Sequence, residues 1–254
     1  MQFLNELASR NPALYYFGWI SLVGALIMLL LIIATSNQVL GINAYIKPFK
    51  FFMSTTIFVW SIAWYVHYLN MSGLERWYSW TVILVLGFEL FWITFKATQG
   101  ELSHFNVSSA FNGIMFSLMG ITISIMTLFT LVVGIYFWTK SFPELPISYV
   151  WGIRIGIICF VIFAFQGGIM GAQLSHTVGG PDGGPGLPLL NWSTVLGDYR
   201  VAHFAGMHAL QILPIAGYYL FTNTRTLAIF SVVYIGICFL VFIQAMMKLP
   251  LIKM

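Results

Sequence analysis

Long apolar segments alternate with short polar ones along almost the whole chain. Each apolar segment is close to the length of about 20 residues that an α-helix needs to cross the hydrocarbon core of a bilayer. Seven segments meet this criterion, at residues 14–34, 48–69, 77–98, 110–138, 147–172, 200–221 and 226–247. The pattern predicts an all-α polytopic membrane protein, with a seven-helix bundle that forms a single membrane domain over residues 1–254.

The composition agrees with this pattern. Of the 254 residues, 59% are hydrophobic and 7% are charged, whereas about 25% are charged in a typical soluble domain. A soluble chain this apolar would have too few polar groups to cover its surface. The net charge of +4 is thinly spread and includes no basic run, which argues against a nucleic-acid partner. The expected partner is the lipid bilayer, and a homo-oligomer is compatible with the sequence.

Polar side chains gather on one face of several predicted helices. With 100° of rotation per residue they form a stripe on one side of each helix, about 140° wide in the sixth, and in an alternating topology the stripes end on the same side of the membrane. The stripes contain Lys47 and Lys50 at the start of the second segment, Glu89 and Lys96 in the third, and Arg200, His203, His208 and Gln211 in the sixth. The connections on that side add Glu101, His104, His176 and Asp182. The sequence therefore predicts a polar cavity that opens to one side of the membrane.

The alternative is that these side chains only extend from the helix ends to the membrane interface. This explanation accounts for Lys47 and Lys50. It does not account for Glu89, which lies seven residues before Lys96 and therefore about 10 Å deeper at 1.5 Å per residue. An ionisable group inside the bilayer costs at least a few kcal/mol and usually marks a functional site.

One long connection follows the fifth segment. Between Gly179 and Pro188 it contains five glycines and three prolines around Asp182, a composition typical of turn-rich loops. Long loops in compact proteins are usually functional lids or disordered, and the apolar residues that flank this one favour a folded cap over the cavity. Asp198 is well placed to be the N-cap of the sixth helix.

Three groups of residues define candidate chemistry for the cavity. Histidine and carboxylate side chains suit acid–base catalysis, and the candidates are His203, Glu101, Asp182 and Glu89. Cationic and amide side chains suit an anionic small molecule or a lipid headgroup, and the candidates are Lys47, Lys50, Lys96, Arg200 and Gln211. The candidate ligands for a transition metal, zinc or iron, are His104, His176 and His208.

The spacing of the histidines leaves the cofactor open. His203 and His208 are five residues apart, whereas two zinc ligands on one helix are commonly four apart, so a metal needs a further ligand from another segment. Haem is a second hypothesis, because histidines from two facing helices can bind its iron. In the third hypothesis the histidines only form hydrogen bonds with helix ends and the loop.

The leading functional hypothesis is a membrane-embedded, metal-assisted enzyme that acts on an amphipathic or anionic substrate in this cavity. One alternative is a small-solute transporter or ligand sensor. Another is a haem-binding or structural subunit of a membrane complex. The sequence contains no P-loop, no G-x-S-x-G motif and no H-E-x-x-H motif, and it does not decide whether the protein is an enzyme.

Four sequence stretches carry a resemblance to known proteins. They are "IKPFKF" (residues 46–51), "GELSHFN" (100–106), "GGPDGGPGLPLLNWS" (179–193) and "GDYRVAHFAGMHALQ" (197–211). With them the chain resembles an uncharacterised group of bacterial multi-pass membrane proteins. The resemblance implies a bacterial inner membrane as the location, and it implies no activity or ligand.

Overall fold

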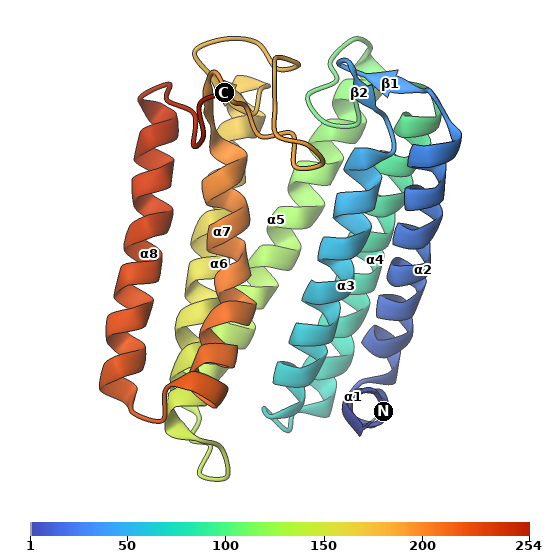
Figure 1. Ribbon diagram of the computed structural model, residues 1–254. Helices are drawn as coiled ribbons and strands as arrows, with labels where there is room; N and C mark the ends of the chain where they lie inside the picture. Colours follow the sequence, from blue (N-terminus) through green and yellow to red (C-terminus); the bar gives the residue numbers. More distant parts are fainter. Residues whose placement is uncertain (1) are drawn as a thin grey trace. The chain divides into compact units, whose positions relative to one another are not determined.

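The computed structural model describes residues 2–254, which are predominantly helical (Figure 1). The α-helices are α1 (Gln2–Arg10), α2 (Pro12–Ala34), α3 (Ile46–His67), α4 (Ser72–Thr98), α5 (Ala110–Thr139), α6 (Ile147–Gln173), α7 (Tyr199–Ile215) and α8 (Thr224–Met246), and a π-helix, η1 (Ala216–Leu220), continues α7. Two short antiparallel pairs are present, β1 (Gln38–Val39) with β2 (Ile42–Asn43) and β3 (Thr177–Val178) with β4 (Gly197–Asp198). The predicted all-α fold class is confirmed.

Six helices of the described chain, α2 to α6 and α8, are long and apolar enough to cross a membrane. They begin and end within a few residues of six of the predicted segments, so the protein is a multi-pass helical membrane protein. The seventh predicted segment, 200–221, is divided between α7 and η1, where Pro214 lies inside the helix. At 17 residues, α7 alone is shorter than a typical span, and the predicted count of seven is not confirmed.

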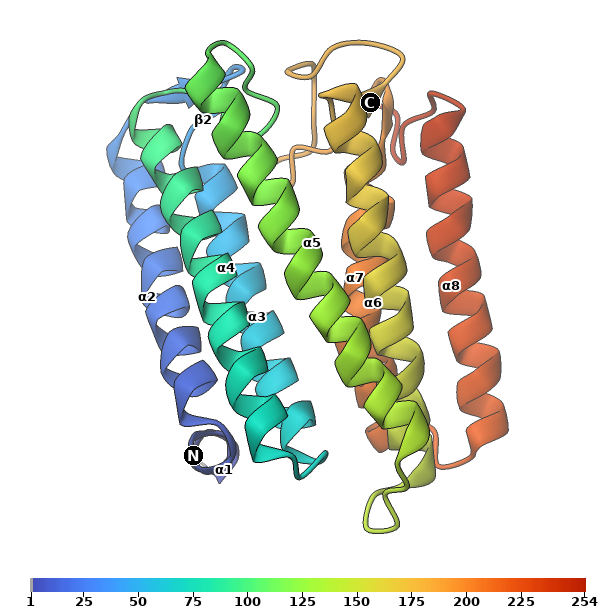
Figure 2. The ribbon, with the colours of Figure 1, turned by 180° about the vertical axis from the view of Figure 1, so that it is seen from behind.

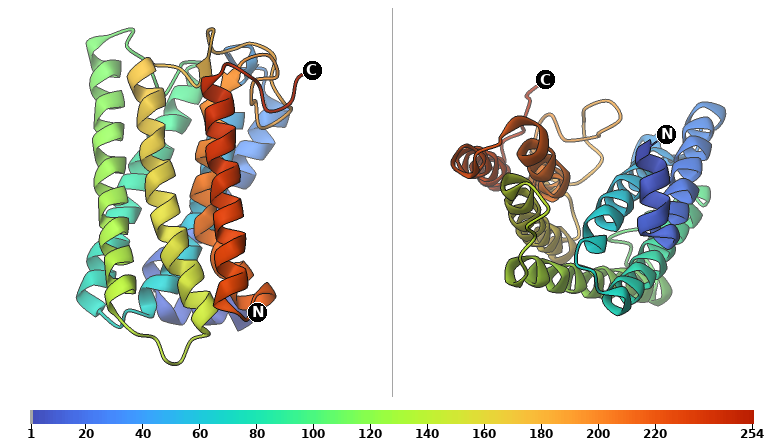
Figure 3. Two further views of the ribbon diagram at one scale, coloured as in Figure 1. Left: turned by 90° about the vertical axis from the view of Figure 1, so that its left-hand side faces the viewer. Right: turned by 90° about the horizontal axis from the view of Figure 1, so that it is seen from below.

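The chain divides into two compact units, Met1–Met126 and Thr127–Met254, here called unit 1 and unit 2. In unit 1, α2, α3 and α4 pack side by side (Figures 1 and 2). The short helix α1 packs against α2 and α3 at the end of unit 1 that is seen from below in Figure 3. Its Leu7 is fully buried, and the guanidinium of Arg10 lies 3.9 Å from the ring centroid of Trp64.

In unit 2, glycines let α6 and α7 approach closely. A Cβ on Gly156 would lie 2.8 Å from the carbonyl oxygen of Ala209, and one on Gly206 would overlap the ring of Phe163. The small residues Ala202 and Ala209 of α7 are fully buried, as small residues at helix contacts in membranes generally are. Helix α8 packs against both helices (Figure 3).

Contacts at both ends show that α7 and η1 together extend along most of α6. At one end the Ser148 hydroxyl donates a hydrogen bond to the carbonyl of Gly217, at 2.7 Å. At the other end the amide of Tyr199 donates to the carbonyl of His176, at 3.1 Å. The segment from Tyr199 to Leu220 therefore extends along most of the membrane helix beside it.

Candidate functional sites

Glu89 is the buried carboxylate of unit 1. It lies inside the membrane helix α4 and is 5% exposed. Its Oε2 lies 3.9 Å from Nε2 of His104, and Lys47 is close enough to interact with it electrostatically. Among residues 2–254 no group donates a hydrogen bond to the Glu89 carboxylate. This arrangement is unusual, because buried carboxylates are normally hydrogen-bonded.

His104 reaches Glu89 from the loop between α4 and α5. Its ring packs against Phe51 of α3 and Phe116 of α5, with centroid distances of 5.7 and 6.3 Å. The Ser103 hydroxyl lies 3.2 Å from Nδ1 of His104, and the indole of Trp92 donates to the Ser103 carbonyl at 3.3 Å. Side chains from three helices therefore hold the imidazole in place, with Nε2 directed toward Glu89.

Lys96, seven residues after Glu89 on the same stripe of α4, has different partners. Its side chain is buried, and Nζ donates to Glu101 Oε2 at 2.8 Å and to Gln99 Oε1 at 3.0 Å. The same Nζ lies 5.1 Å from the ring centroid of Trp92. Thus Lys96, predicted to bind substrate, and Glu101, predicted to be catalytic, form an ion pair with each other.

Lys47 and Lys50 lie in the first turns of α3. The N-cap residue Tyr45 forms no side-chain hydrogen bond to this helix end. A helix N-terminus carries partial positive charge, which two lysines increase. Cationic residues thus gather at the end of α3 that lies beside His104, while Glu89 offsets part of the charge.

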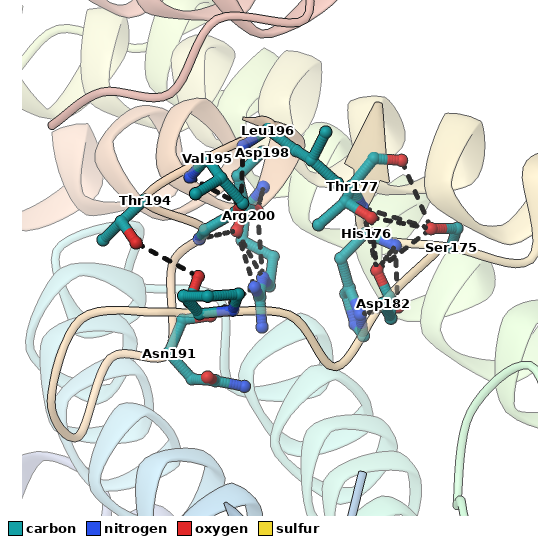
Figure 4. Close-up of polar contacts among 12 residues, drawn as sticks. Ser175, His176, Thr177, Asp182, Asn191, Thr194, Val195, Leu196, Asp198 and Arg200 are labelled. Atoms are coloured by element: carbon teal, nitrogen blue, oxygen red, sulfur yellow. Dashed lines mark hydrogen bonds and ion pairs between the residues drawn. The ribbon is translucent and has the colours of Figure 1, made fainter. Parts of the chain in front are cut away.

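Asp182 organises the long loop of unit 2 (Figure 4). Its carboxylate accepts hydrogen bonds from the Ser175 hydroxyl, from the amides of His176 and Thr177, and from the Thr177 hydroxyl, at 2.9–3.1 Å. Nδ1 of His176 lies 2.7 Å from Oδ2. Burial by itself raises the pKa of Asp182, but the hydrogen bonds and charge of His176 hold the pKa well below its ordinary range.

The other predicted residues of unit 2 have identifiable contacts. Asp198 is the N-cap of α7, as predicted, and accepts from the Arg200 amide at 3.0 Å. The Arg200 guanidinium pairs with Asp198 at 2.6 Å and also donates to the Asn191 carbonyl (Figure 4). These contacts fix the start of α7 to the loop.

The histidines of α7 face different neighbours. Nδ1 of His203 lies 2.6 Å from the carbonyl oxygen of Phe163, so the imidazole links α7 to α6, and His176 is close enough to interact with it electrostatically. Nδ1 of His208 lies 3.2 Å from Oε1 of Gln211, and its ring packs against Phe204. His203 and His208 therefore form separate contacts.

No group of three or more histidine, cysteine, aspartate and glutamate side chains within residues 2–254 is arranged to hold a metal ion. The predicted set His104, His176 and His208 is not brought together as a metal site. His104 instead lies beside Glu89 and Ser103, His176 contacts Asp182, and His208 contacts Gln211. The metal-assisted form of the enzyme hypothesis is therefore unsupported.

Several residues of these sites were not among the predicted ones. Ser103, Ser175, Thr177 and Asn191 all bond to predicted residues. A sequence signal exists for two of them, because Ser175 and Thr177 flank His176 just before the glycine-rich stretch and such hydroxyls commonly bond within turns. For Ser103 and Asn191 the contact depends on loop conformation.

Comparisons with protein-family models, curated proteins and solved structures give no match to this chain.

Proposed function

We propose that this membrane protein exchanges a proton and binds a small anion at the site formed by Glu89, His104 and Lys47 in unit 1, as a transporter or a ligand sensor. The observation that carries the proposal is the buried Glu89 carboxylate inside a membrane helix, which faces an imidazole and receives no hydrogen bond from the described residues. A buried ionisable group in a membrane span is costly, and it is kept where it has a function.

The geometry suits proton exchange. Glutamate and histidine both change charge near neutral pH when their surroundings favour it. The separation of 3.9 Å between Nε2 and Oε2 is longer than a hydrogen bond, so a small movement of the loop or one water molecule would connect the two groups. The Glu89 carboxylate accepts no hydrogen bond from residues 2–254, so hydrogen bonding does not fix its charge.

The charges around this pair suit an anion. Lys47, Lys50 and Lys96 outnumber Glu89 and Glu101 at this end of unit 1. Lys47 and Lys50 both lie in the first turns of α3, so positive charge is concentrated at this helix end. The N-terminus of α3 also attracts negative charge. A carboxylate or phosphate group would neutralise this end of the helix.

The proton exchange can be tested in liposomes that contain a trapped pH-sensitive dye. We expect an imposed membrane potential to drive a pH change in vesicles that contain the protein, and Glu89→Gln to reduce the rate to that of protein-free vesicles. Glu75→Gln is the matched control, since Glu75 is in the same helix but accepts a hydrogen bond from Asn11 at 3.1 Å, which an amide can still accept. Equal rates for wild type and Glu89→Gln would contradict the transporter form of the proposal.

Anion binding needs a second measurement. Phosphate, acetate and a medium-chain fatty acid are suitable probes, and we expect at least one of them to raise the melting temperature of the purified protein. Lys47→Gln should remove this effect. If none of the three probes stabilised the protein, the result would contradict anion binding at this site.

An enzyme remains the second candidate, and a specific contact favours it. The 2.7 Å contact between Asp182 and His176 Nδ1 resembles the carboxylate–histidine pairs that orient a general base. In such a pair Nε2 is the proton acceptor. His203, one of the four catalytic residues predicted from the sequence, would act beside this pair. The test is hydrolysis of a fatty-acyl nitrophenyl ester or of phosphatidylglycerol, which His176→Gln should abolish and His67→Gln should not.

We further propose that α7 and η1 form the seventh membrane crossing. The segment extends along most of α6 through its contacts at Ser148 and His176. If α6 crosses the bilayer, a segment of 17 and 5 residues packed along most of it crosses too. A bacterial inner membrane, as the resemblance implies, is the location that we propose.

A further inference from the structure

An apolar groove lies between α5 and α6 within unit 2. Its volume is about 310 Å³, at the lower end of the range of small-molecule sites. It is lined by Leu131, Gly134, Ile135, Trp138, Thr139 and Ile158. Both helices are membrane spans, and the lining residues Ile135 and Ile158 are 52% and 37% exposed. A groove of this kind in the hydrocarbon region is suited to an alkyl chain.

A cationic cluster lies at one end of this groove. Trp138 lines the groove and packs edge-on against Trp151, with ring centroids 5.2 Å apart. The guanidinium carbon of Arg154 lies 5.8 Å from the ring of Trp138 and 5.2 Å from that of Trp151. Lys140 follows directly after α5, within two residues of Trp138. Trp138 therefore belongs both to the lining of the apolar groove and to the basic and aromatic cluster, so the two adjoin.

Arg154 is held at this position and still has donors to offer. Its Nε donates to the Phe137 carbonyl at 2.8 Å and its Nη2 to the Lys140 carbonyl at 3.0 Å. Both acceptors are at the C-terminal end of α5, whose partial negative charge a cation stabilises. No acceptor for Nη1 is present in residues 2–254. Glu144, the carboxylate of the following loop, is exposed and forms no ion pair with Arg154 among these residues.

We propose that this groove binds one anionic phospholipid of the bilayer. One acyl chain would lie between α5 and α6. The phosphate would accept hydrogen bonds from Arg154 and would be attracted by the positive charge of Lys140. The two tryptophans of the cluster, Trp138 and Trp151, support this assignment, because tryptophan side chains gather where headgroups meet the hydrocarbon core. Basic pockets between membrane helices bind anionic headgroups for the same electrostatic reason. The groove belongs to unit 2 alone and is independent of the Glu89 site.

Native mass spectrometry of the delipidated full-length protein in detergent tests the proposal. The probes are phosphatidylglycerol and phosphatidylcholine with identical acyl chains. We expect one tightly bound phosphatidylglycerol per chain, with an affinity at least about ten-fold above that for phosphatidylcholine. Equal affinities for the two lipids would overturn the proposal.

Variants separate the headgroup contact from the groove. Lys140→Gln should lower the affinity for phosphatidylglycerol about five-fold, which is the effect of one surface charge near an anionic lipid. Arg154→Gln should lower this affinity further. Neither should change the affinity for phosphatidylcholine. If Arg154→Gln does not fold, because two carbonyls lose their donor, Lys140→Gln alone decides. A preference for phosphatidylglycerol that Lys140→Gln leaves intact would refute the headgroup assignment.

The groove itself is tested by filling it. Ile135→Trp places a large side chain in the groove and should lower the affinity for both lipids. Val132→Trp is the matched control, because Val132 is also exposed on α5, at 40%, but does not line the groove. Equal lipid binding by wild type and both variants would exclude the groove as the acyl-chain site.

Discussion

At the scale of single residues, Asp182 is the clearest case of a polar side chain whose contacts define its role. One carboxylate ties Ser175, His176 and Thr177 to the glycine-rich turn. Asp182→Asn keeps one carbonyl acceptor but places an NH₂ group opposite donors. We expect this change to lower the free energy of unfolding by about 1–3 kcal/mol at neutral pH.

The effect of Asp182 should depend on pH in a defined direction. Because the pKa of Asp182 is lowered in the folded protein, its contribution is present above the unfolded carboxyl pKa of about 3.9 and decreases as the pH falls toward the folded pKa. The difference in melting temperature between wild type and Asp182→Asn should therefore be constant above about pH 5 and shrink below about pH 4. A difference that persisted unchanged into acid would contradict this account.

The sequence identified the buried ionisable residues better than their partners. Glu89 and Lys96 were placed inside the bundle by their spacing of seven residues, and both are buried. Their partners could not be derived, because His104 and Glu101 lie in a loop whose conformation depends on contacts with Phe51 and Phe116. A helical stripe specifies direction, whereas a loop position depends on residues far apart in the chain.

At the scale of helices, the close packing of α6 on α7 is open to a direct test. Gly156→Leu should push the helices apart and lower the free energy of unfolding by about 1–3 kcal/mol, because its Cβ would meet backbone atoms at Ala209 and Leu210. Thermal unfolding in detergent measures this effect.

Gly168 provides the control in the same helix. A Cβ at this position would have no atom within 4 Å, so Gly168→Leu should be neutral or stabilise the protein by up to about 1 kcal/mol through helix propensity. Similar losses for both substitutions would show that helix packing is not the cause.

The helices themselves followed from apolar segment length, which is a strong signal in membrane proteins. The helix α1 was not predicted, because its nine residues are mixed in polarity and its stability depends on burial of Leu7 and on Arg10 over Trp64. The break between α7 and η1 depends on Pro214 and on local backbone geometry. The break has no periodic pattern in the sequence, whereas Phe3, Leu4 and Leu7 of α1 do recur at helical spacing, but over too few residues to predict a helix.

At the scale of the whole molecule, the number of crossings decides where the two chain ends lie. With six crossings the termini would be on the same side of the membrane, and with seven they would be on opposite sides. Since α7 and η1 extend along most of α6, we expect reporter fusions at the two ends to report opposite sides. Termini on the same side would show that α7 and η1 do not cross the membrane.

The proposed function depends most directly on whether Glu89 takes up and releases a proton in the membrane. Infrared difference spectroscopy of the protein in lipid, recorded as the buffer is stepped from alkaline to acidic pH, measures this event through the C=O band of a protonated carboxyl group. We predict a band that appears on acidification in wild type and in Glu75→Gln, and that is missing in Glu89→Gln. A set of spectra in which Glu89→Gln is identical to wild type would contradict a proton-exchanging site at Glu89 and His104.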